Sequence, residues 1–249
     1  MIHLKECVQN SKALAKALRE NGRSHIQYRL YTSMERALST ILYGKLFLTN
    51  GSNWNDTDDK RILADRRLYA TCFSTSTQEN IAMWMLYSDE KGKKGASLVF
   101  PKGVINDILE NSQVFVGNFG NDGKFNAIKE LKREQYELFM SDIVYIDKCD
   151  KDSVKITIRE EHVTVSREIL NDTDIFTKHF AWNYEKECRM ILRLQEKNLI
   201  KENYSATMVM IPKKSMAKLR KDRLVRSPLY KGAECGRPSE LIGKVDWEL

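Results

Sequence analysis

Two glutamates and an arginine alternate late in the chain, where Glu185, Glu187 and Arg189 stand two residues apart. They run into a predicted strand, CRMILRL. Side chains two apart on a strand point to the same face, so the three charged groups are expected to share one face. Like charges on one face repel unless a cation, a ligand or water lies between them. The pattern therefore allows either a solvated strand edge with Arg189 as counter-ion or a carboxylate pair directed into a cleft.

Two further polar groups lie beside predicted strands, Tyr28-Arg29 and Ser74-Thr75-Ser76. A guanidinium can bind a phosphate group through two parallel hydrogen bonds, which makes Arg29 a candidate anion ligand. Each group also has a simpler explanation. Arg29 can pair with a surface acid, and Ser76 can begin a capping box with Glu79. That box predicts a helix in which Trp84 belongs to the core stripe.

The order of predicted elements favours an α+β fold, because strands follow one another in the second half of the chain. We expect an N-terminal helix, residues 1–25, appended to a single catalytic domain, residues 26–249. No GxGxxG follows a strand, which argues against a dinucleotide-binding parallel sheet. The other expected elements are helices over 3–21, 35–43, 124–141 and 213–223, and strands over 45–48, 69–74, 96–100, 113–117, 143–146, 154–158, 188–194 and 206–211.

Composition limits the possible classes of protein. The chain has 249 residues, a net charge of +7 and a pI near 9.0, which favours a polyanionic partner such as nucleic acid. No apolar run is long enough to span a membrane and the N-terminus lacks a signal peptide, so we expect a cytoplasmic protein without a membrane partner. The five cysteines contain no CxxC pair, which supports neither a disulfide framework nor a structural zinc site.

Common hydrolytic and metal-binding motifs are missing from the sequence. Only four histidines are present, no two of them have a ligand spacing, and no GxSxG nucleophile motif occurs. The acidic loop over residues 49–59 does not match the spacing of a calcium loop. We therefore assign no metal.

The polar groups, taken in chain order, resemble a known signature. An arginine on an early strand, a Ser-Thr-Ser triplet ending a middle strand and a Glu-x-Glu on a late strand are similar to the Arg/Ser-Thr-Ser/Glu signature of ADP-ribosyltransferases. Over roughly residues 26 to 195 the chain also resembles the DUF2971 family. The motifs that carry this second resemblance are YR, ILYGKLFL, an NWND loop with Trp54 in place of phenylalanine, CFS followed by MWMLY, GASLVF, and K-x3-W-x2-E-x-E-x-R from Lys178 to Arg189.

The transferase resemblance implies a split β-sandwich with flanking helices and NAD as co-substrate. Glu187 would stabilise an oxocarbenium-like ribose through its 2′-hydroxyl, and Glu185 would orient or deprotonate the acceptor. Arg29 would bind the pyrophosphate and take part in catalysis. The remaining cofactor contacts implied by the resemblance are Tyr28, Ser74, Thr75, Ser76, Trp84, Tyr87 and Arg189.

The resulting expectation is a mono-ADP-ribosyltransferase of bacterial toxin or phage-defence type. RNA is favoured over DNA as the acceptor, a protein acceptor is nearly as well supported, and an inhibitory antitoxin protein is a possible partner. The alternative is a metal-dependent nuclease or nucleic-acid-binding module, whose acids would be Asp56, Asp58, Asp59, Glu185 and Glu187. A third interpretation is an interaction protein that uses the N-terminal helix and the basic C-terminal helix.

Overall fold

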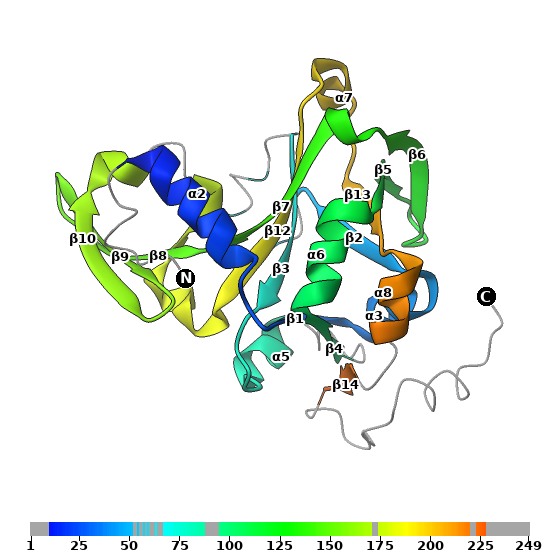
Figure 1. Cartoon of the computed structure of the whole chain (residues 1–249), viewed down its shortest axis with the longest axis horizontal. Coiled ribbons are helices and arrows are strands. Elements are labelled where there is room, and N and C mark those ends of the chain that lie inside the picture. The colour runs from blue at the N-terminus through cyan, green and yellow to red at the C-terminus, as the bar shows by residue number, and fades with distance from the viewer. Residues whose placement is uncertain are drawn as a thin grey trace. The chain divides into compact units, whose positions relative to one another are not determined.

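The protein has a mixed α+β fold with antiparallel sheets and several helices (Figure 1). The computed structural model describes residues 10–51, 54, 57, 59, 63, 67–87, 95–170, 174–219 and 223–227. The chain forms two compact units, each from three segments. The first unit comprises Met1–His25, Phe47–Cys72 and Val114–Met208, and the second comprises Ile26–Leu46, Phe73–Gln113 and Val209–Leu249. No helix among the described residues is long and apolar enough to cross a membrane.

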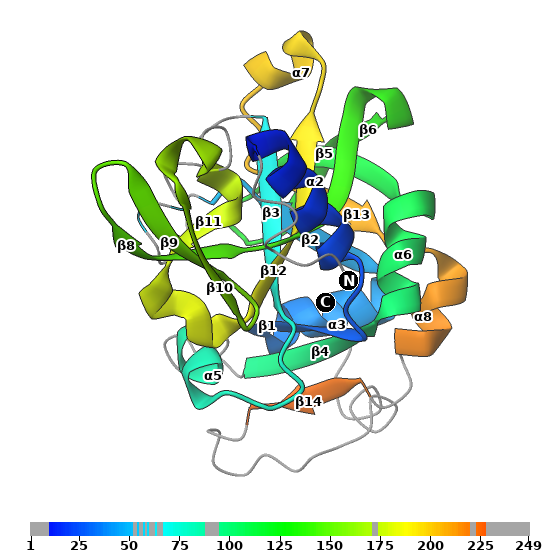
Figure 2. The same cartoon turned by 60° about the vertical axis from the view of Figure 1, so that its left-hand side comes forward.

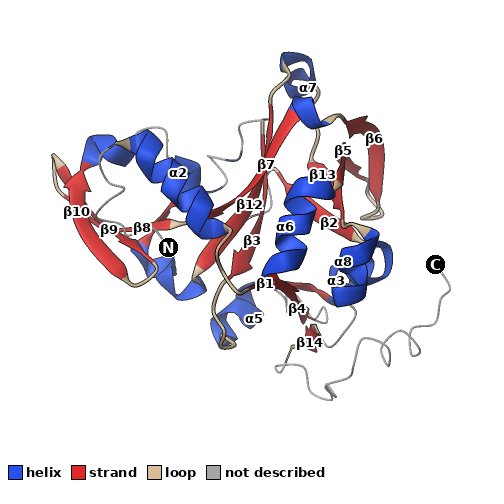
Figure 3. Ribbon diagram, viewed as in Figure 1, coloured by secondary structure: helices blue, strands red, loops and turns tan. Residues whose placement is uncertain are grey.

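The second unit is built on an antiparallel ladder. Strand β1 (Gln27–Ser33) pairs with β4 (Gly95–Pro101) along its whole length, and β14 (Leu224–Arg226) pairs with the other edge of β4. On its second edge, β1 meets the end of β3 (Leu68–Ser74), where Arg29 lies opposite Ser74. Figure 3 shows the helices of this unit, which are α3 (Met34–Tyr43), α5 (Ile81–Tyr87), α6 (Lys102–Asn111) and α8 (Lys213–Leu219).

Helix α3 follows from local signals. The Ser33 hydroxyl accepts a hydrogen bond from the backbone N–H of Arg36, which satisfies one of the free donors of the first turn. Gly44 ends the helix in the left-handed conformation at φ 70°, where a residue without Cβ is favoured. Ala37 and Ile41 form its buried face. The sequence prediction for this helix is confirmed.

Helix α5 begins later than its predicted capping box. The Asn80 side chain caps it by accepting from the N–H of Ala82 at 2.9 Å. Ser76 instead closes a short turn, in which its hydroxyl accepts from the N–H of Gln78 at 3.1 Å. Glu79 pairs with Arg29 at 3.3 Å. The predicted Ser76–Glu79 capping box is therefore wrong, because both side chains have other partners.

The first unit combines a small sheet with a pair of long strands. Among the described residues, the small sheet has the strand order β10-β9-β8-β11, from Glu161–Ser166, Ser153–Ile158, Val144–Cys149 and Thr177–His179 (Figure 2). Strand β7 (Tyr136–Asp142) pairs antiparallel with β12 (Glu187–Leu194). The other elements are β2 (Lys45–Thr49), β5 (Gln113–Phe119), β6 (Phe125–Leu131), β13 (Ala206–Met210), α7 (Lys197–Lys201), and the 3-10 helices η2 (Arg133–Gln135), η3 (Arg167–Leu170), η4 (Asp174–Phe176) and η5 (Phe180–Glu185).

The N-terminal helix is an integral part of this unit's core. Helix α2 (Ser11–Gly22) is capped by Asn10, whose side chain accepts from the N–H of Ala13. Leu14 and Leu18 pack with Phe139 of β7 and Ile191 of β12. The predicted helix over 3–21 is thus present from Ser11 onward, and residues 1–9 lie outside the described part of the chain.

The helix predicted over residues 124–141 is wrong, because β6, η2 and β7 occupy that stretch. Nearly every residue of β7 is buried, so the strand does not alternate apolar with polar residues. Strand β6 is the opposite case, since most of it is exposed. Both strands are defined by pairing with distant partners, β6 with β5 and β7 with β12, and that pairing leaves no periodic signal in the local sequence.

The end of α2 approaches β7 so closely that only glycine fits. A Cβ added at Gly22 would lie 2.7 Å from both the N and Cα atoms of Ser141. Since these are backbone atoms, the helix end would have to move. We predict that Gly22→Ala lowers the free energy of unfolding by about 1–3 kcal/mol, measured by denaturant titration.

The matched control is Gly103→Ala in helix α6, where an added Cβ meets nothing within 4 Å. This variant should be neutral or more stable by about 0.5–1 kcal/mol, because alanine favours helix. Equal unfolding midpoints for the two variants would contradict the close approach at Gly22.

Candidate functional site

The paired glutamates come from two different elements. Glu187 begins strand β12, whereas Glu185 ends the 3-10 helix η5. Lys186 between them has a left-handed backbone at φ 46°, and this turns the chain from one element into the other. The prediction that all three charged groups alternate on one strand is therefore wrong for Glu185. Glu187 and Arg189 do share a face of β12, with Arg189 Nε 2.5 Å from Glu187 Oε1.

A lysine lies between the two carboxylates. Lys178 of β11 places its Nζ 2.6 Å from Glu185 Oε2 and 3.1 Å from Glu187 Oε2. All three side chains are almost fully buried. The expected repulsion between the carboxylates is thus relieved by a cation, and their burial excludes the solvated strand edge.

Arg189 extends the network to a third carboxylate. Its Nη2 lies 2.7 Å from Asp59 Oδ1, and its Nη1 donates to the backbone carbonyl of Ile175 at 3.1 Å. Lys178 Nζ also lies 3.6 Å from Asp59 Oδ2. We call Asp59, Lys178, Glu185, Glu187 and Arg189 the ionic cluster. It lies entirely within the first unit.

Aromatic residues surround the ionic cluster. The ammonium of Lys178 is 4.9 Å from the centre of the Trp182 ring, and the guanidinium of Arg189 is 5.4 Å from that of Trp54. Cations over aromatic faces at these distances gain a further attraction that grows as water is excluded. The backbone N–H of Glu187 donates to the Tyr145 hydroxyl at 2.8 Å, which fixes the start of β12.

The charges of the ionic cluster are mutually dependent. Burial alone would raise the pKa of Glu187, but Arg189 and Lys178 hold it well below its usual value. Burial would lower the pKa of Lys178, but Glu187 and Glu185 raise it. For Asp59, burial outweighs Arg189 and raises the pKa. Glu187 is therefore ionised at neutral pH, and its contacts with Lys178 and Arg189 hold the carboxylate from two sides.

A second polar cluster surrounds Arg29 in the second unit. Arg29 Nη1 donates to the Ser97 hydroxyl at 3.2 Å and to Glu79 at 3.3 Å. Both contacts are long for charge-assisted hydrogen bonds. The Nε–H of Arg29 is buried and meets no acceptor among the described residues. Since buried donors in folded proteins are nearly always satisfied, this group has capacity for a ligand.

The hydroxyl triplet lies next to Arg29. Ser74 is buried and faces Arg29 across the β1–β3 pairing. Its hydroxyl accepts from the N–H of Ser76 at 3.4 Å. Thr75 and Ser76 are half-buried. Arg29 and the start of the triplet are thus neighbours in the second unit.

The aromatic candidates are mainly core residues. Tyr28 is fully buried and packs edge-on against Phe73, with ring centres 6.2 Å apart. Trp84 is also fully buried, edge-on to Tyr31 at 5.0 Å. Tyr87 is half-buried beside this pair and is therefore the more accessible of the two expected cofactor contacts Trp84 and Tyr87.

The sequence predicted no role for Lys178, and it predicted a role for Asp59 only as an acid of the nuclease alternative. Lys178 is part of the K-x3-W-x2-E-x-E-x-R motif, and that spacing was the available signal for its pairing with the glutamates. Asp59 is 130 residues from Arg189, so no local spacing could reveal the contact. Asp56 and Asp58, the other acids of the nuclease alternative, lie outside the described residues.

A protein-family model described as "Protein of unknown function (DUF2971)" matches residues 83–190. The matched range contains Lys178, Glu185, Glu187 and Arg189, whereas Arg29 and Ser74 precede it. No curated protein and no solved structure matches the chain.

The ionic cluster makes a direct prediction about stability. Lys178→Met removes the ammonium and leaves Glu185 and Glu187 facing each other in a buried site. We expect the free energy of unfolding to fall by about 3–5 kcal/mol in denaturant titrations. Adding Glu185→Gln to this variant should recover part of the loss, because it removes one of the two repelling charges.

The control is Lys155→Met, which breaks a 3.2 Å pair with Asp147 at a lysine side chain that is 46% exposed. This loss should stay below about 1 kcal/mol. A similar small loss for Lys178→Met would show that the buried contacts contribute little to stability.

Proposed function

We propose that the protein is an NAD-dependent mono-ADP-ribosyltransferase with the split β-sandwich fold and flanking helices that the resemblance implies. The observation that carries the proposal is the incompletely satisfied guanidinium of Arg29, which faces Ser74 across paired strands. A buried cation with a spare donor is suited to an anionic ligand. The pyrophosphate of NAD is such a ligand, and the neighbouring hydroxyls suit its ribose.

Glu187 supplies the electrostatic part of the proposed chemistry. Nicotinamide leaves as a neutral base and takes with it the electron pair of its bond to ribose C1′. Positive charge then develops on the ribose, and an ionised carboxylate hydrogen-bonded to the 2′-hydroxyl stabilises it. Lys178 and Arg189 keep Glu187 ionised and oriented for this role. The acceptor atom forms the new bond to C1′ and gives its proton to Glu185.

The charge of the chain bears on the acceptor. With a net charge of +7, the protein attracts polyanions, so we favour RNA over DNA and retain a protein acceptor as the second possibility. An enzyme that modifies a nucleic acid of its own cell needs an inhibitor of its activity. An inhibitory antitoxin partner fits the proposed toxin or phage-defence role.

The geometry of the ionic cluster favours a transferase over a metal-dependent nuclease. Asp59, Glu185 and Glu187 gather in one place, as a two-metal or one-metal site would need. However, Lys178 contacts all three carboxylates, and Arg189 bridges Asp59 and Glu187. A divalent ion among these acids would have to displace two buried cations.

The first test concerns Glu187. Glu187→Gln preserves the shape of the side chain and removes its charge, so transfer of labelled ADP-ribose from NAD should fall at least about a hundredfold. The assay offers separate pools of RNA, DNA and protein, with and without chelator. The control is Glu137→Gln, which alters a partly exposed carboxylate paired with Arg19 and should leave transfer unchanged.

Unfolding curves of both variants identify any loss that comes from misfolding. Full activity in folded Glu187→Gln rejects the role of this carboxylate. Cleavage of RNA or DNA that stops with chelator and does not depend on NAD supports the nuclease alternative instead.

The second test concerns Arg29. Arg29→Gln should weaken NAD binding and reduce the rise in melting temperature that NAD produces in the unmodified protein. The matched control is Arg36→Gln, at an exposed position of α3 in the same unit. If NAD raises the melting temperature of both variants equally, Arg29 does not bind the nucleotide.

A further inference from the structure

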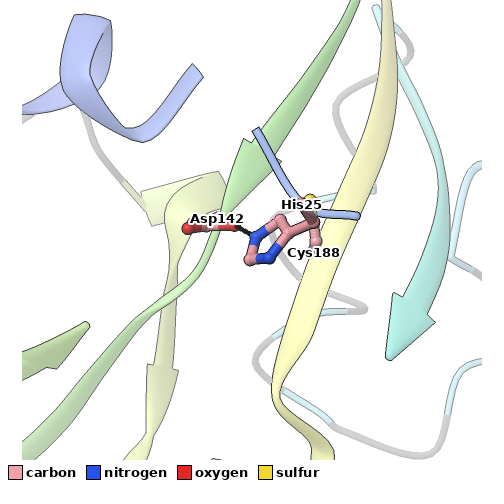
Figure 4. A group of neighbouring side chains, drawn as sticks. All are labelled: His25, Asp142 and Cys188. Carbon is pink, nitrogen blue, oxygen red and sulfur yellow. Dashed lines mark hydrogen bonds and ion pairs between the residues drawn. The ribbon is translucent and has the colours of Figure 1, made fainter. Parts of the chain in front are cut away.

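A second cluster of reactive groups lies on the opposite face of β12 from Glu187. Cys188 pairs with Asp142 across the β12–β7 ladder, so their side chains point to the same face. His25 reaches the same point from the segment that follows α2. Figure 4 shows the three side chains meeting from three separate segments, all of them in the first unit.

These three side chains offer a compact set of metal ligands. His25 Nε2 lies 2.5 Å from Asp142 Oδ1, and the ligand atoms of His25, Asp142 and Cys188 all lie within 4.8 Å of one another. Cys188 and Asp142 are buried, and the side chain of His25 is 13% exposed. A thiolate, an imidazole and a carboxylate are the three ligand types that zinc accepts. We propose that His25, Asp142 and Cys188 form a zinc-binding site.

The position of His25 depends on the close contact at Gly22. Helix α2 ends where its backbone meets Ser141, the residue before Asp142. The Gly22 carbonyl accepts from the Cys188 thiol at 3.5 Å, so the helix end also contacts β12. Ser24 then turns the chain by donating to the Asn21 carbonyl at 2.7 Å. Contacts of the residues that precede His25 therefore place it beside the two paired strands.

Arg159 orients the carboxylate of this site. It stands at the β9–β10 turn with a left-handed backbone at φ 56°, a conformation that is strained for a residue with a side chain. Its Nε donates to Asp142 Oδ2 at 2.8 Å, which leaves Oδ1 toward His25. Its Nη2 donates to the Asn21 carbonyl at 2.8 Å and to the Ser24 hydroxyl at 3.0 Å. Carboxylate ligands of metals are commonly held by such outer partners.

The ring nitrogen of His25 is close to both Asp142 and Arg159. His25 Nε2 lies 2.5 Å from Asp142 Oδ1 and 3.2 Å from Arg159 Nη2. Both hydrogens of Arg159 Nη2 are directed to the Asn21 carbonyl and the Ser24 hydroxyl, so Arg159 can keep these contacts when Nε2 binds a metal ion. Zinc binds nitrogen and oxygen ligands at about 2.0–2.2 Å, so Nε2 and Oδ1 would move apart by about 1 Å to bind one ion together.

A nucleophilic cysteine is a weaker interpretation of the same residues. The Cys188 thiol is buried and already donates to the Gly22 carbonyl at 3.5 Å. A metal ion would use all three side chains at once, and zinc bound by three protein ligands takes a water molecule as the fourth.

The test uses the full-length chain without a histidine tag, treated with chelator and titrated with Co²⁺ as a spectroscopic substitute for zinc. We expect one equivalent to bind with the near-ultraviolet absorption of a thiolate–cobalt bond. Zn²⁺ should displace it and raise the melting temperature. Cys188→Ser should lose the thiolate band, and His25→Gln should weaken binding by at least about tenfold.

Matched controls are Cys72→Ser and His162→Gln in the same unit. The Cys72 thiol contacts Glu187 and the His162 ring contacts Thr157, so neither belongs to the proposed ligand set. Both should bind like the unmodified protein. Circular dichroism confirms that each variant is folded, and the Zn²⁺-dependent shift of His25→Gln remains measurable if Cys188→Ser fails to fold. Absence of a thiolate band in the unmodified protein, or an unchanged band in Cys188→Ser, overturns the proposal.

Discussion

The interaction on which the first unit depends is the contact of one buried ammonium with two glutamates. Lys178 lies within hydrogen-bond distance of both Glu185 and Glu187, and Arg189 holds Glu187 from its other side. Without these cations the carboxylates would repel each other in a site that excludes water. The left-handed backbone of Lys186 turns the chain into β12, and this turn brings Glu185 and Glu187 to the same ammonium.

The sequence predicted the parts of the structure that are encoded locally. Helix α3 forms over the predicted residues 35–43, and Ser33 and Gly44 cap it by acting on the backbone beside them. The helix predicted over residues 124–141 is wrong because β6 and β7 form by pairing with strands elsewhere in the chain. The predicted capping box of α5 is wrong for a related reason. Glu79 contacts Arg29, fifty residues away, instead of the start of the helix.

The same distinction applies to the candidate sites. The glutamates, Arg189 and Lys178 lie within twelve residues, and a motif could link them. Asp59 joins them from 130 residues away, and His25 meets Asp142 across 117 residues. Spacing rules for metal ligands search short stretches of chain, so they could not find a histidine, an acid and a cysteine brought together by the end of α2 and one strand pair.

Strand β12 carries two polar sites on its opposite faces. Glu187 and Arg189 point to the ionic cluster, while Cys188 between them points to His25 and Asp142. Because neighbouring side chains alternate, an insertion or deletion of one residue near the start of this strand would exchange the two faces. The thiol would then enter the ionic cluster and a charged group would face the imidazole. Substitutions can therefore alter either site of β12 separately, whereas a change of one residue in the length of this segment disrupts both sites together.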